Sequence, residues 1–195
     1  MSDVQIVSLR CEYLVDPLGI DETLPRLSWR LESGRRGVRQ VAYRVRVAST
    51  IDRLTQERCD RWDSGRVDSA QTTQVVYAGV ELRSREHCVW DVEVRDETGE
   101  VSRSAIAKWS MGLLGDCDWE AQWIAADQEI VVRDPAAIAP SLLNPGTPSR
   151  FRREFEVPAS VVRATLYASA RGVVELRANG RAVTEDLFAP EWTGL

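Results

Sequence analysis

The chain has 195 residues, of which 44% are hydrophobic, and its formal net charge at pH 7 is −5. This length predicts one or two domains, and the hydrophobic fraction is sufficient for a packed core. A net negative chain whose only lysine is Lys108 is not expected to follow nucleic-acid phosphates, so nucleic acid is excluded as a partner.

The N-terminal residues MSDVQIVSLRCEYLV lack the basic region and apolar stretch of a secretory signal. No segment approaches the ~18 apolar residues of a membrane span, so we expect a cytoplasmic chain with no membrane partner. The cysteines form no C-x-x-C pair and are expected to be buried free thiols rather than zinc ligands or disulfides. They are Cys11, Cys59, Cys88 and Cys117.

Three segments within residues 1–115, RLSWRLE, VAYRVRV and CVWDVEVRD, alternate apolar and polar side chains. A period of two predicts strands that bury one face. The side chains predicted to point inward are Leu27, Trp29, Leu31, Val41, Tyr43, Val45, Val47, Cys88, Trp90, Val92 and Val94. Those predicted to point outward are Arg30, Arg44, Arg46, His87, Asp91, Glu93 and Arg95.

Turn signals such as ESGRRG, WDSGRVDS and DETGE separate these strands. The run STIDRLTQE predicts one short helical turn, capped by Ser49 or Thr50. Regularly spaced strands without a long helical period favour an all-β fold. We therefore predict a fibronectin-III-like or immunoglobulin-like β-sandwich over residues 1–115.

The pattern of alternating apolar and polar residues is lost over residues 116–149, which we expect to form a connector. Trp119 and Trp123 are four positions apart, which fits one face of a helical turn, although Trp123 could equally open a strand. Prolines then exclude the segment from a sheet interior and predict a loop. They are Pro135, Pro140, Pro145 and Pro148.

Alternation returns over residues 150–195, in FRREFEV, RATLYASA and VVELRANGRAV. Asn179-Gly180 is a strong hairpin signal, because a type I′ turn needs positive φ at both positions. Four or five strands are too few for a stable sandwich of this class. We therefore expect a partial, truncated β-sandwich domain, and open strand edges would favour pairing into a homo-oligomer.

The run LRCEYLVDPLGIDETLPRLSWRLES resembles the opening of bacterial α-L-rhamnosidases, where Leu-x-x-Glu-Tyr-x-x-x-Pro-x-Gly-Ile leads into Pro-Arg-Leu-Ser-Trp. The resemblance continues through RWDSGRVDS, WSMGLL, DWEAQWI, FRREFEV and ELRANGRAV, and only the proline-rich stretch matches poorly. Two departures are Cys88, where the family has an aromatic residue at or beside this position, and Glu191, where it has glycine. Glycine there would permit positive φ, so the family's loop geometry around Trp192 is not assumed for this chain.

The resemblance implies a fibronectin-III-like sandwich, then a jelly-roll β-domain, an (α/α)₆ barrel that carries the chemistry and a C-terminal β-domain. It also implies hydrolysis of terminal α-L-rhamnose from glycosides with inversion. On this interpretation the chain covers the first domain and an incomplete jelly-roll-type β-sandwich. The rhamnose-containing glycoside would then be a partner only of the full-length enzyme.

Inverting hydrolysis needs an acid and a base whose carboxyl groups lie ~6.5–9.5 Å apart. The sequence offers no convincing pair, because its clustered carboxylates fit ordinary turns or solvated loops. We therefore predict no catalytic residue in this chain and no activity on its own. The carboxylates considered were Asp16, Asp21, Glu22, Glu185, Asp186 and Glu191.

A sugar or calcium site in the second domain is a further candidate, because the resemblance implies that some jelly-roll domains bind rhamnose through calcium. Glu175, Asn179 and Asp186 have the oxygen atoms that calcium prefers, and Trp192 offers a flat apolar face to a sugar. The alternative is that Asn179 forms the turn, Glu175 points outward from a strand and Trp192 packs against the barrel. No cofactor other than calcium is expected.

Three functions therefore stay open from the sequence. The first is the non-catalytic N-terminal part of an α-L-rhamnosidase. The second is a free-standing carbohydrate-binding module, and the third is a sandwich used only for protein–protein contact.

Overall fold

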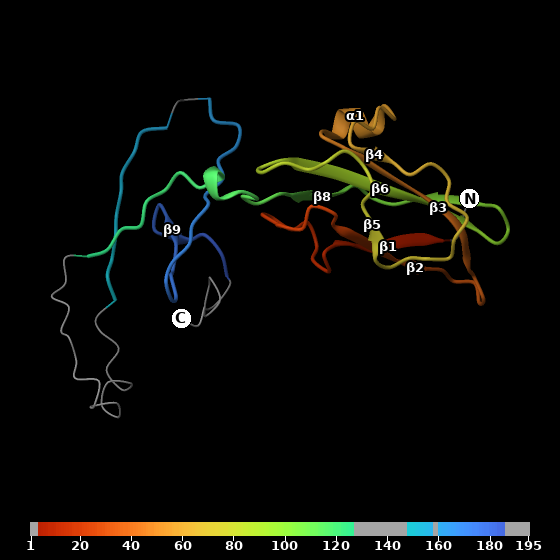
Figure 1. The fold of residues 1–195 in the computed structure, drawn as a ribbon. Coiled ribbons are helices and arrows are strands. Elements are labelled where there is room, and N and C mark those ends of the chain that lie inside the picture. Colours follow the sequence, from red (N-terminus) through yellow and green to blue (C-terminus); the bar gives the residue numbers. More distant parts are fainter. Residues whose placement is uncertain (1–3, 127–147, 158–159, 186–195) are drawn as a thin grey trace, which may run out of the picture. The chain divides into compact units, whose positions relative to one another are not determined.

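The computed structural model describes residues 4–126, 148–157 and 160–185. The chain divides into two units, residues 1–124 and residues 125–195. The described structure is nearly all β, as predicted, with several antiparallel sheets and little helix (Figure 1). The division after Ile124 lies inside the segment that the sequence marks as a connector.

The smaller sheet of the first unit has the order β1-β2-β5 and is antiparallel throughout. Its strands are β1 (Gln5–Cys11), β2 (Arg26–Glu32) and β5 (Val75–Val76). The register between β1 and β2 shifts between Val7 and Arg10, which marks a bulge.

The larger sheet has the order β4-β3-β6-β7, and β8 also pairs with β6, all antiparallel. Its long central strands pair over most of their length, which confirms two of the strands predicted from alternation. The strands are β3 (Gln40–Ala48), β4 (Trp62–Asp63), β6 (His87–Asp96), β7 (Val101–Arg103) and β8 (Ala107–Ser110).

The two sheets lie one over the other (Figure 1), and the apolar core fills the space between them. Trp29 and Trp90 are buried there, as predicted. Tyr77 packs its ring edge-on against Trp62 and Trp109, with centroids 5.5 Å and 6.0 Å away. Burial of these large aromatic side chains contributes substantially to the stability of the unit.

A one-turn helix, α1 (Ile51–Thr55), follows β3 on the outer side of the larger sheet (Figure 1). Thr50 caps it, because its hydroxyl accepts a hydrogen bond from the Arg53 amide at 3.3 Å, which confirms one of the two predicted caps. Leu54 is the buried side chain of the helix. The outer face of the sheet is therefore covered at this end.

This cover makes part of the inward–outward assignment wrong. Arg46 has no exposed side-chain surface and Asp91 is also buried, although alternation predicts both to face solvent. His87 is half-buried rather than exposed. Val41 is exposed where burial was predicted, because the register of β3 shifts between Gln40 and Ala42. Alternation identified the strands but could not show which outer positions another element covers.

In the second unit the structure places a hairpin at the predicted turn, between β9 (Arg177–Ala178) and β10 (Arg181–Ala182). Asn179 and Gly180 have φ values of 50° and 81°, as a type I′ turn requires. The strands expected in residues 151–157 and 163–170 are not formed, and most of their side chains are exposed. No neighbouring strand pairs with them in the described part of this unit.

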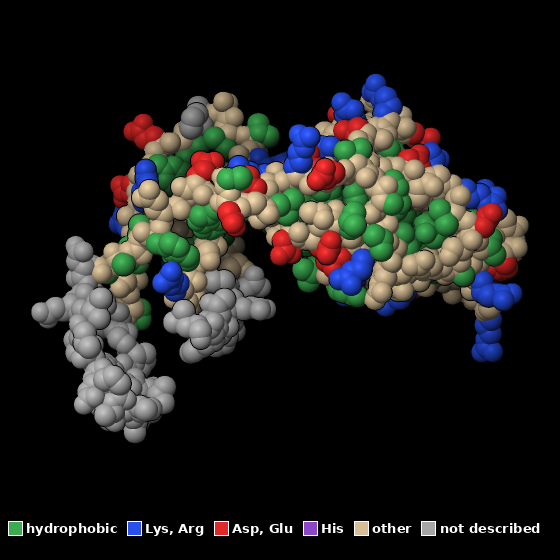
Figure 2. All heavy atoms as spheres, viewed as in Figure 1, with side chains coloured by type: hydrophobic (Ala, Val, Ile, Leu, Met, Phe, Trp, Pro, Cys, Tyr) green, Lys and Arg blue, Asp and Glu red, His purple; other side chains and the backbone are tan. Residues whose placement is uncertain are grey.

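Trp119 follows a short 3₁₀ helix, η1 (Asp116–Asp118), and Trp123 lies in no helix or strand. The four cysteines are free, as predicted, but only Cys11 and Cys88 are buried. Within the described ranges, no helix is both long and apolar enough to span a membrane. On the face of the molecule in view, Figure 2 shows hydrophobic side chains dispersed among charged ones.

Candidate functional site

The predicted sugar or calcium residues are only partly within the described structure. Glu175 is exposed and forms an ion pair with Arg177, whose Nε lies 2.7 Å from the Glu175 Oε1. Asn179 is exposed at the hairpin turn, where its positive φ serves the chain reversal. Asp186 and Trp192 lie outside the described residues. Nowhere in residues 4–126, 148–157 or 160–185 do three His, Cys, Asp or Glu side chains gather around a possible metal position.

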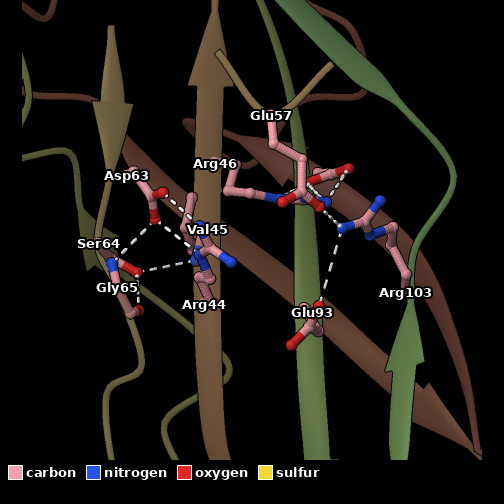
Figure 3. Close-up of polar contacts among 10 residues, drawn as sticks. Arg44, Val45, Arg46, Glu57, Asp63, Ser64, Gly65, Glu93 and Arg103 are labelled. Carbon is pink, nitrogen blue, oxygen red and sulfur yellow. Dashed lines mark hydrogen bonds and ion pairs between the residues drawn. The ribbon is translucent and has the colours of Figure 1, made fainter. Parts of the chain in front are cut away.

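A charged cluster on the outer face of the larger sheet is centred on the buried Arg46 of β3 (Figure 3). The Arg46 guanidinium donates to both carboxylate oxygens of Asp91 on β6, over 2.6–2.9 Å. Its Nη1 also lies 3.1 Å from Glu57, which accepts a second bond from Arg103 at 2.9 Å. Arg103 lies within 3.8 Å of Glu93, so the cluster joins three strands and the end of α1.

A second pair extends the cluster to the loop that follows β4. Arg44 donates to both oxygens of Asp63, at 2.8 Å and 2.6 Å. Asp63 also accepts from the Gly65 amide at 3.0 Å, and Ser64 Oγ accepts from the Val45 amide at 2.8 Å (Figure 3). These bonds hold the loop against β3.

The contacts within the cluster indicate a structural rather than a catalytic role. Hydrogen bonding from Arg44 lowers the pKa of Asp63, and hydrogen bonding from Arg103 lowers that of Glu57. Burial raises the pKa of Asp91, an effect that the hydrogen bonds from Arg46 oppose. A general acid must reach its substrate, whereas both Asp91 oxygens face Arg46 and the side chain is buried. The cluster therefore cross-links the sheet.

Beside this cluster the surface has an open hollow with a volume of about 210 Å³. Two of its arginines are paired with carboxylates, Arg44 with Asp63 and Arg66 with Asp68. The third, Arg95, shares the lining with the carboxylate of Glu93. The hollow therefore has no excess positive charge to select an anion. Its lining residues are Ala42, Tyr43, Arg44, Gly65, Arg66, Glu93 and Arg95.

Hydrogen bonds also hold the segment that leaves the sandwich, an arrangement that sequence reasoning missed. Asp118 of η1 accepts from the hydroxyl of Ser84 and, at 3.0 Å, from the Gly115 amide. Arg85 donates to the Asp118 carbonyl at 2.6 Å, and the Leu114 amide donates to Ser84 at 2.8 Å. The bond from Ser84 is the main reason that the pKa of Asp118 is lowered. We call these five residues the exit clasp.

Residues 6–115 match the family described as the Rha78A-like, N-terminal immunoglobulin domain. The chain belongs to this family. The matched range contains both sheets and the charged cluster around Arg46, and it ends just before η1. The fold expected from the resemblance is therefore confirmed for the sandwich.

Curated relatives extend the similarity to most of the chain. An α-L-rhamnosidase of Alteromonas sp. (strain LOR) is 37% identical over 186 residues, which cover 93% of this chain and 20% of that protein. An α-L-rhamnosidase of Streptomyces avermitilis is 38% identical over an alignment 199 positions long, which covers 94% of this chain and 18% of that protein. The chain thus spans about a fifth of the length of these relatives.

Solved structures show the same relation. The Streptomyces avermitilis α-L-rhamnosidase complexed with L-rhamnose superposes with a TM-score of 0.60 and 43% identity, over 63% of this chain and 12% of that one. The α-L-rhamnosidase from Dictyoglumus thermophilum gives a TM-score of 0.59 and 30% identity, over 62% and 14%. Both matches cover a small share of a much longer chain.

Proposed function

We propose that this chain is the N-terminal, non-catalytic region of an α-L-rhamnosidase that releases terminal α-L-rhamnose from glycosides with inversion. One observation carries the proposal: more than nine tenths of the chain aligns with α-L-rhamnosidases, yet covers only about a fifth of their length. The rhamnose-containing glycoside would be a substrate of the whole enzyme.

The described residues support a scaffolding role for this region. The buried carboxylate Asp91 has both oxygens occupied by Arg46, so it cannot serve as acid or base on a sugar. Asp63, Glu57 and Glu93 lie in ion pairs of the same cluster. The sandwich is thus a cross-linked domain that would support a catalytic region. The cytoplasmic location stays a prediction.

The test is a chimera in which this chain replaces the matched N-terminal region of the Streptomyces avermitilis α-L-rhamnosidase. We expect the chimera to hydrolyse 4-nitrophenyl α-L-rhamnoside, measured by nitrophenol absorbance, whereas the 195-residue chain alone releases none. Turnover by a clean preparation of the chain alone would contradict its non-catalytic role. A chimera without activity would contradict the equivalence of the two N-terminal regions.

Binding of sugar or calcium by the second unit stays a separate prediction. Glu175 and Asn179 are both exposed, and the other two candidate residues are outside the described structure. Titration calorimetry of the chain with L-rhamnose and with Ca²⁺ decides the question. The absence of heat at millimolar ligand would remove the carbohydrate-binding alternative.

A further inference from the structure

The loop between β1 and β2, residues 12–25, exposes a row of apolar side chains on the first unit. Leu18 is 80% exposed and Val15 67%, and each of the others has about half or more of its surface in solvent. Clustered exposed apolar residues with a polar surround are typical of interaction sites. The apolar side chains of this β1–β2 loop are Tyr13, Leu14, Val15, Leu18 and Leu24.

The backbone of the β1–β2 loop is strained. Glu12, Tyr13 and Asp16 have φ values of 48°, 66° and 47°, a region that side chains other than glycine seldom adopt. Cys11 and Leu14 pair through two backbone hydrogen bonds of 2.9 Å and 3.0 Å, which close this tight turn. Such strain persists only where the surrounding structure enforces it, and it concentrates at functional sites.

One end of the β1–β2 loop is fixed by the pair formed by Glu12 and Arg26. The Glu12 carboxylate accepts from Arg26 Nη2 at 2.5 Å and from Arg26 Nε at 3.1 Å. The same guanidinium lies 5.2 Å from the centre of the Tyr13 ring, and Gln74 donates to the Tyr13 hydroxyl at 2.8 Å. The ring is therefore held in place although half of it is exposed.

The other end is fixed to β8. Asp16 accepts from the Lys108 amide at 2.9 Å, and the Pro17 carbonyl accepts from the Ser110 amide at 3.0 Å. The Gly19 amide then donates to the Ser110 hydroxyl at 3.1 Å. Both ends of the loop are thus bonded to the sandwich while Leu14, Val15 and Leu18 project away from it. A rigid apolar surface loses little conformational entropy when a partner covers it.

We propose that the β1–β2 loop is the docking surface of this region for the remainder of a full-length α-L-rhamnosidase, the four fifths of the relatives' length that this chain does not match. The inference rests on the function proposed above. A partner on the same polypeptide is present at an effective concentration in the millimolar range, so a small apolar surface suffices to hold it. Asp16, Asp21 and Glu22 in the loop would disfavour an anionic lipid surface instead.

The experiment compares Leu14→Ser/Leu18→Ser with a matched control, Ile51→Ser/Val80→Ser, in which both side chains are 54% exposed elsewhere on the sandwich. Each pair is made in the 195-residue chain and in the chimera with the Streptomyces avermitilis enzyme. Amide hydrogen exchange of the peptide covering residues 12–25 is expected to be about tenfold slower in the chimera than in the chain alone. The loop variant is expected to abolish that difference, and the control variant to retain it.

Equal exchange in an active chimera and in the chain alone would overturn the docking proposal and leave the proposed function intact. An inactive chimera would contradict the equivalence of the two N-terminal regions, and therefore both the proposed function and the docking proposal. If the loop variant lowers the free energy of unfolding of the chain and of the chimera equally, the loop has a purely structural role, which contradicts the docking proposal. Sedimentation that reveals a dimer abolished by the loop variant would make a second copy the occupant, which also contradicts the proposal.

Discussion

At the scale of single residues, the buried ion pair of Arg46 and Asp91 joins β3 to β6 on the outer face of the larger sheet. A buried ion pair costs much of its own attraction in lost hydration, so it is not a strong source of stability in itself. Removing one partner is different, because the other charge is then buried without compensation. Arg46 has no exposed side-chain surface, and its remaining partner Glu57 is half-exposed.

We predict that Asp91→Asn lowers the free energy of unfolding by about 3 kcal/mol, because it leaves the Arg46 charge without its bidentate partner. Urea denaturation followed by tryptophan fluorescence measures this loss. Glu32→Gln is the control, since the pair of Glu32 and Arg30 is exposed and contributes about 0.5 kcal/mol or less. A loss for Asp91→Asn no larger than the control's would contradict the prediction. The double variant Arg46→Met/Asp91→Leu is expected to recover most of the free energy of unfolding that Asp91→Asn loses, because it buries no charge.

Glu12 gives the β1–β2 loop a pH dependence. The hydrogen bond from Arg26 lowers its pKa in the folded state, so the stability it contributes is fully present above the ordinary glutamate pKa and is lost as pH falls through the lowered value. We predict that Glu12→Gln lowers the melting temperature at pH ~7 and that the difference from wild type narrows towards pH ~3. Differential scanning calorimetry across this range, with the exposed Glu81→Gln as control, measures it. A difference that stays constant with pH would refute this explanation.

At the scale of elements, the chain after β5 passes very close to β4. A Cβ on Gly79 would clash with the Arg61 carbonyl and lie 2.5 Å from Trp62 Cβ and 2.6 Å from the Tyr77 hydroxyl. The Tyr77 hydroxyl in turn donates to the Val80 carbonyl at 2.7 Å, which fixes the turn that contains Gly79. Only a residue without a side chain fits this crossing.

We therefore predict that Gly79→Ala lowers the free energy of unfolding by roughly 3 kcal/mol, since the backbone must move to admit one methyl group. Gly115→Ala is the matched control, because its nearest neighbour would lie at an ordinary 3.4 Å. Chemical denaturation of both variants gives the comparison. Equal effects at the two glycines would show that the close approach does not determine the stability of this turn.

How far each element could be predicted depends on how local its cause is. The alternation in β2, β3 and β6, the Thr50 cap and the Asn179-Gly180 turn are set by neighbouring residues, and the structure confirms them. The burial of Arg46 depends on α1, which directly follows β3, and on Asp91 of β6, 45 positions away, and alternation within one strand predicts neither contact. The exit clasp joins Ser84 to Asp118 across 34 positions and was missed for the same reason.

At the scale of the whole molecule, the buried apolar core of the residues that the structure describes lies in the first unit. The residues that form it run from Ile6 to Met111, while most described side chains of the second unit are exposed. Apolar burial is the dominant favourable term in folding, so the first unit should carry the cooperative stability of the chain. The candidate calcium residues come from the second unit and were chosen by side-chain type, because no sequence pattern there predicts which of them lie close together.

We predict that a chain of residues 1–124 keeps the melting temperature of the whole chain within about 2 °C. Calorimetry of the two chains measures this, and the heat of unfolding should also be nearly the same because the described residues of the second unit contribute little buried surface. A shortened chain that fails to fold, or melts far lower, would show that residues beyond Ile124 stabilise the sandwich.

Cys117 lies between Gly115 and Asp118 of the exit clasp, so a probe on its thiol would follow the start of the connector. Cys117 is exposed within η1, whereas Cys11 and Cys88 are buried and burial raises the pKa of each to about 12. Cys59 is only partly buried, so it is first replaced by serine. In that background a maleimide dye would label Cys117 well before the two buried thiols. The fluorescence anisotropy of the dye would then report the mobility of η1, where the chain leaves the sandwich. The reference is Ser84→Ala, which removes the hydroxyl that donates to Asp118.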